Sequence, residues 1–334
     1  MVAAVAIAHL LNDLIQAVLP AIYPMLKTEF NLSFSQIGLI ALIYQITASL
    51  LQPFVGLYTD RHPLPYLLPV GMSITLIGIA VMAFATHFYI LLLAAVLVGI
   101  GSSTFHPEAS RVARMASGGR FGTAQSAFQV GGNSGSAIGP LLAALIIVPN
   151  GKSAVAWFTG FALLAIFILF RVSRWLIQQA QQPKKQSAVQ HTGLKGILLY
   201  RALGVIGILM LVKFTYIASI SNYYTFYLME RFSLSLVQSQ VYLFAFLAAV
   251  ALGTFAGGPI GDKIGRSAVI WVSFLGIIPF ALVLPYVNLM WTAILSIMIG
   301  LVISSAFSAM VVYAQEAMPG HVGLVSGLMF GVMF

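Results

Sequence analysis

Long apolar runs follow one another along almost the entire chain, separated by short polar turns. Many runs contain about 20 residues, the length that an α-helix needs to cross the hydrocarbon core of a bilayer. A transmembrane β-barrel would instead show short segments of alternating apolar and polar residues. The pattern therefore predicts an all-α polytopic membrane protein. We place its helices at 4–26, 35–59, 65–86, 88–113, 120–148, 154–177, 200–228, 236–260, 267–286, 289–315 and 321–334.

Composition supports this prediction and narrows the function classes. Hydrophobic residues make up 60% of the 334 positions and charged residues only 7%, whereas a soluble domain carries about 25% charged residues. The absence of cysteine excludes disulfide bonds and thiolate metal sites. No protease, hydrolase or nucleotide-binding motif stands in a suitable context. We therefore expect no enzyme, no cofactor and no metal site.

The net charge of +9 is explained by topology. When the 16 Lys and Arg residues are sorted by alternating loops, twelve fall on one side of the membrane and three on the other, and Lys213 lies within a helix. The positive-inside rule makes the first side cytoplasmic. Because orientation accounts for the basic excess, we expect no nucleic-acid partner.

The chain also repeats itself. FNLSFSQ at 30–36 matches FSLSLVQ at 232–238, and GLYTDR at 56–61 matches GPIGDK at 258–263. Repeats in the same orientation imply two parallel six-helix halves related by an axis along the membrane normal. We assign an N-terminal half to 1–178, a cytoplasmic linker to 179–196 and a C-terminal half to 197–334. On this assignment about eleven helices are present, and the second half is truncated within its fifth helix.

A polar stripe runs along the first helix. His9, Asn12, Asp13 and Gln16 follow at i, i+3, i+4 and i+7, which places them on one face. A charge facing lipid would cost roughly 2.5–3.5 kcal/mol, so Asp13 must face a cavity or a partner. It could be a structural hydrogen-bond anchor, but an intramembrane carboxylate more often marks a transport pathway. We assign proton coupling to Asp13 and substrate binding to the other three residues.

The fourth helix ends in the stretch STFHPEASRVAR at 103–114. His106 and Glu108 stand about 200° apart around the helix, so they cannot share a face. An ion pair between Glu108 and Arg111 is possible because they are three residues apart. One face should look into a cavity, and the sequence leaves open which one. We assign proton coupling to His106 and Glu108 and substrate binding to Arg111, whose alternative role is a topology anchor.

The fifth helix has two distinct stripes. Gln125, Gln129, Asn133 and Ser136 form a polar one, from which we assign substrate binding to Gln129 and Asn133. Small residues allow close helix packing, which we expect on the roughly opposite side, at Gly131, Gly135 and Gly139.

The seventh helix carries Lys213 on one face with Tyr216 and Tyr223. A cation beside phenol groups suits an anionic, partly apolar solute. We therefore assign substrate binding to these three residues.

Several motifs resemble those of the major facilitator superfamily. GLYTDR and GPIGDKIGR resemble two copies of its loop signature, although Pro63 and Leu64 replace the final Gly-Arg in the first. GSAIGPLLAA at 135–144 resembles its antiporter signature, with alanines replacing the last two glycines. The resemblance implies antiporter-motif roles for Gly135, Gly139 and Pro140, and gating roles for Gly56, Asp60, Arg61, Gly258, Asp262, Lys263, Gly265 and Arg266. Asp262 should meet the start of the fifth helix near 120–122, and Asp60 the start of the eleventh near 321–323, each at the positive end of a helix.

Four longer stretches resemble a group of bacterial drug exporters within this superfamily: HLLNDLIQAVLPAIYP, FHPEASRVARMASGGR, SISNYYTFYL and VYAQEAMPG. The resemblance implies a monomeric secondary active transporter of the bacterial inner membrane, with its linker and motif loops cytoplasmic. It would export an anionic phosphonate drug in exchange for protons, by alternating access. Its partners would be the small-molecule substrate, protons and the lipid bilayer. A proton-coupled transporter of a natural small anionic metabolite is the alternative, and an intramembrane enzyme or sensor has little support.

Overall fold

The computed structural model describes residues 1–181, 196–234 and 236–333, and these residues form helices and short turns without any strand. The first half contains α1 (Val2–Ala21), α2 (Tyr23–Glu29), α3 (Phe34–Gln45), α4 (Leu51–Arg61), α5 (Leu67–Ala83), α6 (Phe88–Met115), α7 (Phe121–Leu142), α8 (Val148–Asn150) and α9 (Thr159–Gln181). The π-helical segments η1 (Ile46–Leu50) and η2 (Ala143–Ile147) continue α3 into α4 and α7 into α8, and the 3₁₀ segment η3 (Lys152–Phe158) leads into α9. Most of the predicted linker, 182–195, lies outside the described residues.

The second half begins with α10 (Gly196–Phe232). It continues with α11 (Leu236–Ile264), α12 (Arg266–Leu275), α13 (Ile278–Val283), η4 (Leu284–Tyr286), α14 (Leu289–Ala317), η5 (Pro319–His321) and α15 (Val322–Met333).

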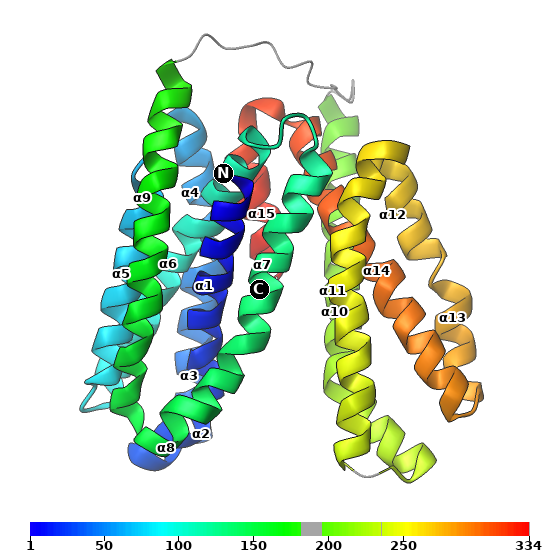
Figure 1. Cartoon of the computed structure of the whole chain (residues 1–334), viewed down its shortest axis with the longest axis horizontal. Coiled ribbons are helices and arrows are strands. Elements are labelled where there is room, and N and C mark those ends of the chain that lie inside the picture. The colour runs from blue at the N-terminus through cyan, green and yellow to red at the C-terminus, as the bar shows by residue number, and fades with distance from the viewer. Residues whose placement is uncertain (182–195, 235, 334) are drawn as a thin grey trace.

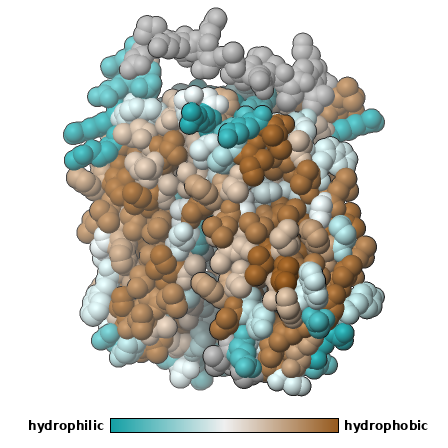
Figure 2. Space-filling view, turned by 45° about the vertical axis from the view of Figure 1, so that its right-hand side comes forward, coloured by the Kyte–Doolittle hydropathy of each residue, from teal (hydrophilic) through white to brown (hydrophobic). Residues whose placement is uncertain are grey.

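The helices have the length and composition of membrane spans. Within the described ranges, nine are long and apolar enough to cross a bilayer, and Leu67–Ala83 and Pro319–Val332 are shorter apolar helices. Figure 2 shows hydrophobic side chains over the middle of the visible face and hydrophilic ones toward its two ends. Large apolar side chains such as Phe167 and Trp271 are exposed, as expected where the surrounding solvent is lipid. The prediction of an all-α, multi-pass membrane protein is confirmed.

Local sequence explains where several helices begin and end. Ser33 accepts a hydrogen bond from the Gln36 amide while the Gln36 side chain accepts one from the Ser33 amide, a capping box that starts α3. The predicted helix 4–26 is instead divided at Ile22, and Pro24 stands in the first turn of α2, where its missing N–H costs nothing. Gly265 has φ +95° and separates α11 from α12, a backbone conformation that favours glycine.

Glycines on α7 bring this helix against α1. A Cβ atom at Gly131, Gly135 or Gly139 would collide with a backbone carbonyl oxygen of α1. The close packing predicted for this stripe is therefore present. It holds the polar stripe of α1 close to α7, where a Cβ atom at Gly132 would collide with the His9 and Asp13 side chains.

The two halves stand side by side, with α1–α9 on the left of Figure 1 and α10–α14 on the right. The end of the molecule at which α9 finishes and α10 starts is called the linker end below; it is at the top of Figure 1. Between the halves, α7 packs against α11, and α15 packs against α4 and α6.

Candidate functional site

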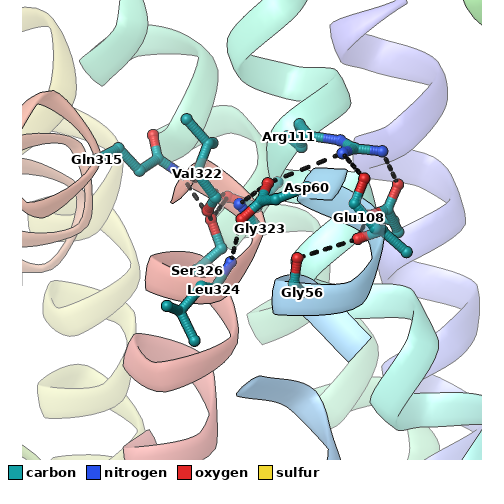
Figure 3. Close-up of polar contacts among 11 residues, drawn as sticks. Gly56, Asp60, Glu108, Arg111, Gln315, Val322, Gly323, Leu324 and Ser326 are labelled. Carbon is teal, nitrogen blue, oxygen red and sulfur yellow. Dashed lines mark hydrogen bonds and ion pairs between the residues drawn. The ribbon is translucent and has the colours of Figure 1, made fainter. Parts of the chain in front are cut away.

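Two aspartates join the halves at the linker end. The Asp262 carboxylate, at the end of α11, accepts hydrogen bonds from the amides of Gly122 (2.9 Å) and Thr123 (2.8 Å) and from the Thr123 hydroxyl (2.8 Å). The Asp60 carboxylate, at the end of α4, accepts hydrogen bonds from the amides of Gly323 (2.8 Å) and Leu324 (2.9 Å), as Figure 3 shows. Each aspartate thus caps the N-terminal, electropositive end of a helix in the opposite half. These contacts are where the loop signatures placed them.

The Asp262 contact is supported by a second acid and a guanidinium. Arg266 Nη2 lies 3.1 Å from an Asp262 oxygen and 3.2 Å from a Glu316 oxygen. The motif arginine is therefore shared between the loop and the end of α14.

At Asp60, Arg111 takes the place of the arginine that the first loop lacks. Its Nη1 lies 3.8 Å from Asp60 and donates a 2.9 Å hydrogen bond to the Thr59 carbonyl. Its Nη2 pairs with Glu108 at 2.5 Å (Figure 3). The Thr59 hydroxyl also donates to Glu108. The ion pair considered for Glu108 and Arg111 is thus present. Arg111 lies beside the linker-end contact instead of lining the cavity described below, because its helix turns this face toward α4.

Hydroxyl and amide groups that sequence reasoning did not select complete the contact between the halves. The Ser126 hydroxyl on α7 lies 2.8 Å from the Thr254 carbonyl and 2.8 Å from the Ser308 hydroxyl. A Cβ atom at Gly122 or at Gly258 would collide with the backbone oxygen of the other. Gly258 opens the second loop signature, and this position was the sequence signal that could have identified the contact.

A buried cluster of His9, Asp13 and His106 lies deeper, between α1 and α6. His9 Nε2 is 3.3 Å from one Asp13 oxygen, and His106 Nε2 is 3.4 Å from the other. His9 and His106 are fully buried, and Asp13 is 6% exposed. Asn12 donates a 3.0 Å hydrogen bond to Asp13.

The ring orientation of both histidines follows from their other nitrogen. His9 Nδ1 lies 2.7 Å from the Phe128 carbonyl, and His106 Nδ1 lies 3.2 Å from the Ser102 carbonyl. A carbonyl only accepts hydrogen bonds, so both Nδ1 atoms carry hydrogen and both Nε2 atoms face the carboxylate.

These three side chains are also the group, within the described part of the chain, whose donor atoms are close enough to hold a metal ion, within 4.8 Å of one another. The sequence alone predicts no metal site. His9 and Asp13 come from α1, about a hundred residues before His106 in the chain, and only the packing of α1 on α6 brings them together.

A cavity of about 530 Å³ lies between the halves, lined by residues of α7, α10, α11 and α14. Among the described residues of its lining, Lys213 is the only charged one, and it is 2% exposed. Its Nζ lies 4.8 Å from the ring centres of Phe214 and of Phe307. Gln129 and Asn133 line the facing wall, where Gln129 donates a 3.0 Å hydrogen bond to Asn133. A cation with two aromatic faces, and with no carboxylate among the described lining residues, suits an anionic ligand.

The profile of the major facilitator superfamily matches residues 5–334. The chain belongs to this superfamily. It is 56% identical over 332 residues to the fosmidomycin resistance protein of Escherichia coli (strain K12), covering 99% of this chain and 82% of that protein. It is 43% identical to the uncharacterized MFS-type transporter YfnC of Bacillus subtilis (strain 168), with the same two coverages. The crystal structure of the superfamily transporter FucP in the outward conformation superposes with a TM-score of 0.71 at 15% identity, covering 99% of this chain and 89% of that one.

The remaining residues that were assigned roles from the sequence lie in three different parts of this superfamily member. Tyr223 is 69% exposed and Tyr216 is partly buried, and neither lines the cavity around Lys213. These tyrosines follow Lys213 on α10 by three and ten residues. Each residue turns an α-helix by about 100°, so both side chains stand at a different angle around the helix axis from Lys213. Arg61 and Lys263 are exposed at the linker end. Pro140 lies near the end of α7.

Proposed function

We propose that the chain is a secondary active transporter that exports fosmidomycin-like anionic drugs across the bacterial inner membrane in exchange for protons. The observation that carries the proposal is the buried Lys213 in a cavity between the two halves. A buried cation is costly unless it is paired, and an anionic substrate would supply the missing charge. The similarity to the fosmidomycin resistance protein supports this class of drug.

Alternating access requires a gate on each side, and the linker end supplies one. Four of the five hydrogen bonds that Asp60 and Asp262 accept there come from backbone amides, so they do not depend on side-chain identity in the opposite half. Breaking both sets would separate α11 from α7 and α4 from α15. We assign this end to the cytoplasm, so that the present conformation is closed to the cytoplasm.

Proton exchange requires that the proton and the substrate oppose each other's binding, a negative coupling free energy between two sites. We assign the proton to the cluster of Asp13 with His9 and His106. The helix α7 packs against α1 through its glycines and lines the Lys213 cavity with its polar stripe. A change of charge at Asp13 can therefore alter the binding free energy of the substrate. Protonation from the periplasm would favour release of the substrate, and deprotonation on the cytoplasmic side would restore binding.

The test uses everted membrane vesicles with an acid interior and labelled fosmidomycin. Uptake should be lost when an uncoupler removes the gradient. Lys213→Met should reduce the initial rate about 30-fold or more, because loss of one partner of a buried charge pair costs about 2–5 kcal/mol. Lys27→Met, at a surface lysine packed over Phe34, is the matched control and should transport normally.

Three results would contradict the proposal. Uptake that persists with the uncoupler would rule out proton exchange. Normal uptake by Lys213→Met would rule out Lys213 as the anion site. No uptake by a folded, inserted protein would favour the second candidate, a transporter of a natural small anionic metabolite, which the same cation in the same cavity supports.

A further inference from the structure

The buried cluster of His9, Asp13 and His106 has the ligand composition of a transition-metal site. Zn²⁺ binds imidazole nitrogen and carboxylate oxygen, and two histidines with one carboxylate are a recurring ligand set that leaves a position open for water. Each of the three side chains offers one donor atom, and these atoms all lie within 4.8 Å of one another. The residue types and their proximity therefore suit a metal ion as well as a proton.

The distances between the donor atoms leave room for an ion at the centre of the cluster. Two ligands held about 2.0–2.1 Å from a tetrahedral zinc ion stand about 3.3–3.4 Å apart. The Nε2 atoms of His9 and His106 lie 3.3 Å and 3.4 Å from the two oxygens of Asp13. Both distances exceed the range of about 2.7–3.2 Å that is usual for an N–H···O hydrogen bond, and His9 Nε2 has no hydrogen-bond partner among the described residues. A metal ion between these atoms would satisfy the buried nitrogen without a large movement of either helix.

The groups around the cluster hold its side chains in the form that binds metal. Both histidines donate their Nδ1 hydrogen to a backbone carbonyl, one to Phe128 at 2.7 Å and the other to Ser102 at 3.2 Å. In a neutral imidazole this leaves the lone pair on Nε2, the atom that faces the carboxylate. Histidines that bind metals usually donate their other ring N–H in this way, and carboxylate ligands are themselves hydrogen-bonded, as Asp13 is by Asn12 at 3.0 Å. The supporting hydrogen bonds of a metal site are therefore present.

A small cavity beside α1 gives an ion a route to the cluster. Its volume is about 210 Å³, and Asp13 lines it together with Gln16 and Tyr44. Asp13 is the accessible member of the cluster, at 6% exposed, whereas both histidines are fully buried. An entering ion would therefore meet the carboxylate first, and it would take its remaining ligand as water from this cavity.

We propose that His9, Asp13 and His106 bind one divalent transition-metal ion, of which Zn²⁺ is the typical case. Imidazole suits Zn²⁺ and its neighbours in the first transition row, whereas Mg²⁺ and Ca²⁺ take oxygen ligands, so the site discriminates between these two classes of cation. Metal binding requires neutral histidines and an ionised carboxylate, so the ion and a proton exclude each other from the cluster. Zn²⁺ therefore inhibits proton exchange. This inhibition rests on the proposed function, whereas metal binding itself does not.

The test measures metal binding by calorimetry on the purified full chain, without a histidine tag, in nanodiscs of zwitterionic lipid. The wild-type protein should bind one Zn²⁺ ion per chain and should bind Mg²⁺ about a hundredfold more weakly or not at all. His106→Gln keeps a polar side chain of similar length and removes the imidazole, so the affinity for Zn²⁺ should fall about 10- to 100-fold. His87→Gln is the matched control, because His87 is exposed at the start of α6, outside the cluster. It should leave the dissociation constant within threefold.

The absorption spectrum of Co²⁺ provides a test in the wild-type protein that needs no variant to fold. Co²⁺ in a four-coordinate site absorbs visible light far more strongly than the six-coordinate aqueous ion. The protein should therefore develop intense Co²⁺ bands, which added Zn²⁺ should abolish. A spectrum equal to that of aqueous Co²⁺ would overturn the site, as would a Zn²⁺ affinity that is unchanged in His106→Gln.

Uptake by everted vesicles separates this inference from the proposed function. Saturating Zn²⁺ should reduce the uncoupler-sensitive uptake of labelled fosmidomycin at least tenfold, both in the wild-type protein and in His87→Gln. Zn²⁺ that binds to the cluster without slowing uptake would overturn the inhibition and show that the exchanged proton is held elsewhere. Absence of uptake even without Zn²⁺ would contradict the proposed function alone, because calorimetry and the Co²⁺ spectrum decide the metal site independently.

Discussion

Removal of the Asp262 carboxylate should open the linker end. In Asp262→Ala, the amides of Gly122 and Thr123 and the Thr123 hydroxyl lose their acceptor. A hydrogen bond to a charged group contributes about 1.5–3 kcal/mol. In the separated state water would replace each of these bonds, so we take about 2–4 kcal/mol as the net loss from the closed state. The ratio of closed to open molecules should then fall about 30- to 700-fold, at 1.4 kcal/mol per factor of ten.

Because the chain contains no cysteine, the opening of the linker end can be measured with labels attached to introduced cysteines. Cysteines introduced at Leu64 and Ser267, both exposed near the linker end of opposite halves, can carry a pair of spin labels. Pulsed electron spin resonance should show one short distance in the otherwise wild-type protein and an added, longer distance in Asp262→Ala. Glu29→Ala removes an acidic group paired with Lys152 in the first half and should leave the distance unchanged. An unaltered distribution in Asp262→Ala would refute the gating argument.

Three further predictions use other parts of the structure. Asp13→Asn should abolish uncoupler-sensitive uptake while the protein remains folded in the membrane; pH-driven uptake in that variant would remove Asp13 from the mechanism. Glu108→Gln removes the charged partner that holds Arg111 beside Asp60. It should lengthen the distance between the spin labels at positions 64 and 267 in a fraction of molecules. A distance distribution identical to that of the parent protein would show that the ion pair is dispensable for the gate. Gly135→Leu places side-chain atoms against the Leu10 carbonyl and should lower the melting temperature, since overpacking costs about 1–3 kcal/mol, whereas Gly38→Leu, with nothing within 4 Å, should melt like the parent protein.

The linker end shows how far a local motif can predict a contact. Because a loop aspartate at the end of one helix is suited to capping another, the motif identified Asp60 and Asp262 together with their partner helices. It did not identify Arg111 as the guanidinium beside Asp60, since that side chain comes from α6, fifty residues along the chain. Nor did it select Ser126 and Ser308, whose contact requires the approach of α7 to α14.

The buried cluster shows the opposite limit. Helical spacing correctly put His9, Asp13 and Gln16 on one stripe, but spacing carries no information about what a stripe faces. His106 was assigned to proton coupling without any partner, and the structure supplies Asp13 as its neighbour. Tyr223 was grouped with Lys213 by approximate spacing, and the structure leaves it exposed.

Three properties can be read from the sequence alone: that the chain is a helical membrane protein, where its helices approximately lie, and which polar residues fall within the membrane-spanning segments. These properties follow from local chemistry. Unpaired backbone groups are costly in a bilayer, and a helix of about 20 consecutive apolar residues is favoured there. Three other properties required the folded structure: Lys213 faces a cavity, Asp13 lies between two histidines, and Arg111 lies at the linker end. Each of these depends on which helix packs beside which and at what rotation. That choice is made by distributed contacts, such as the glycines of α7 against α1, and no single segment of the sequence encodes it.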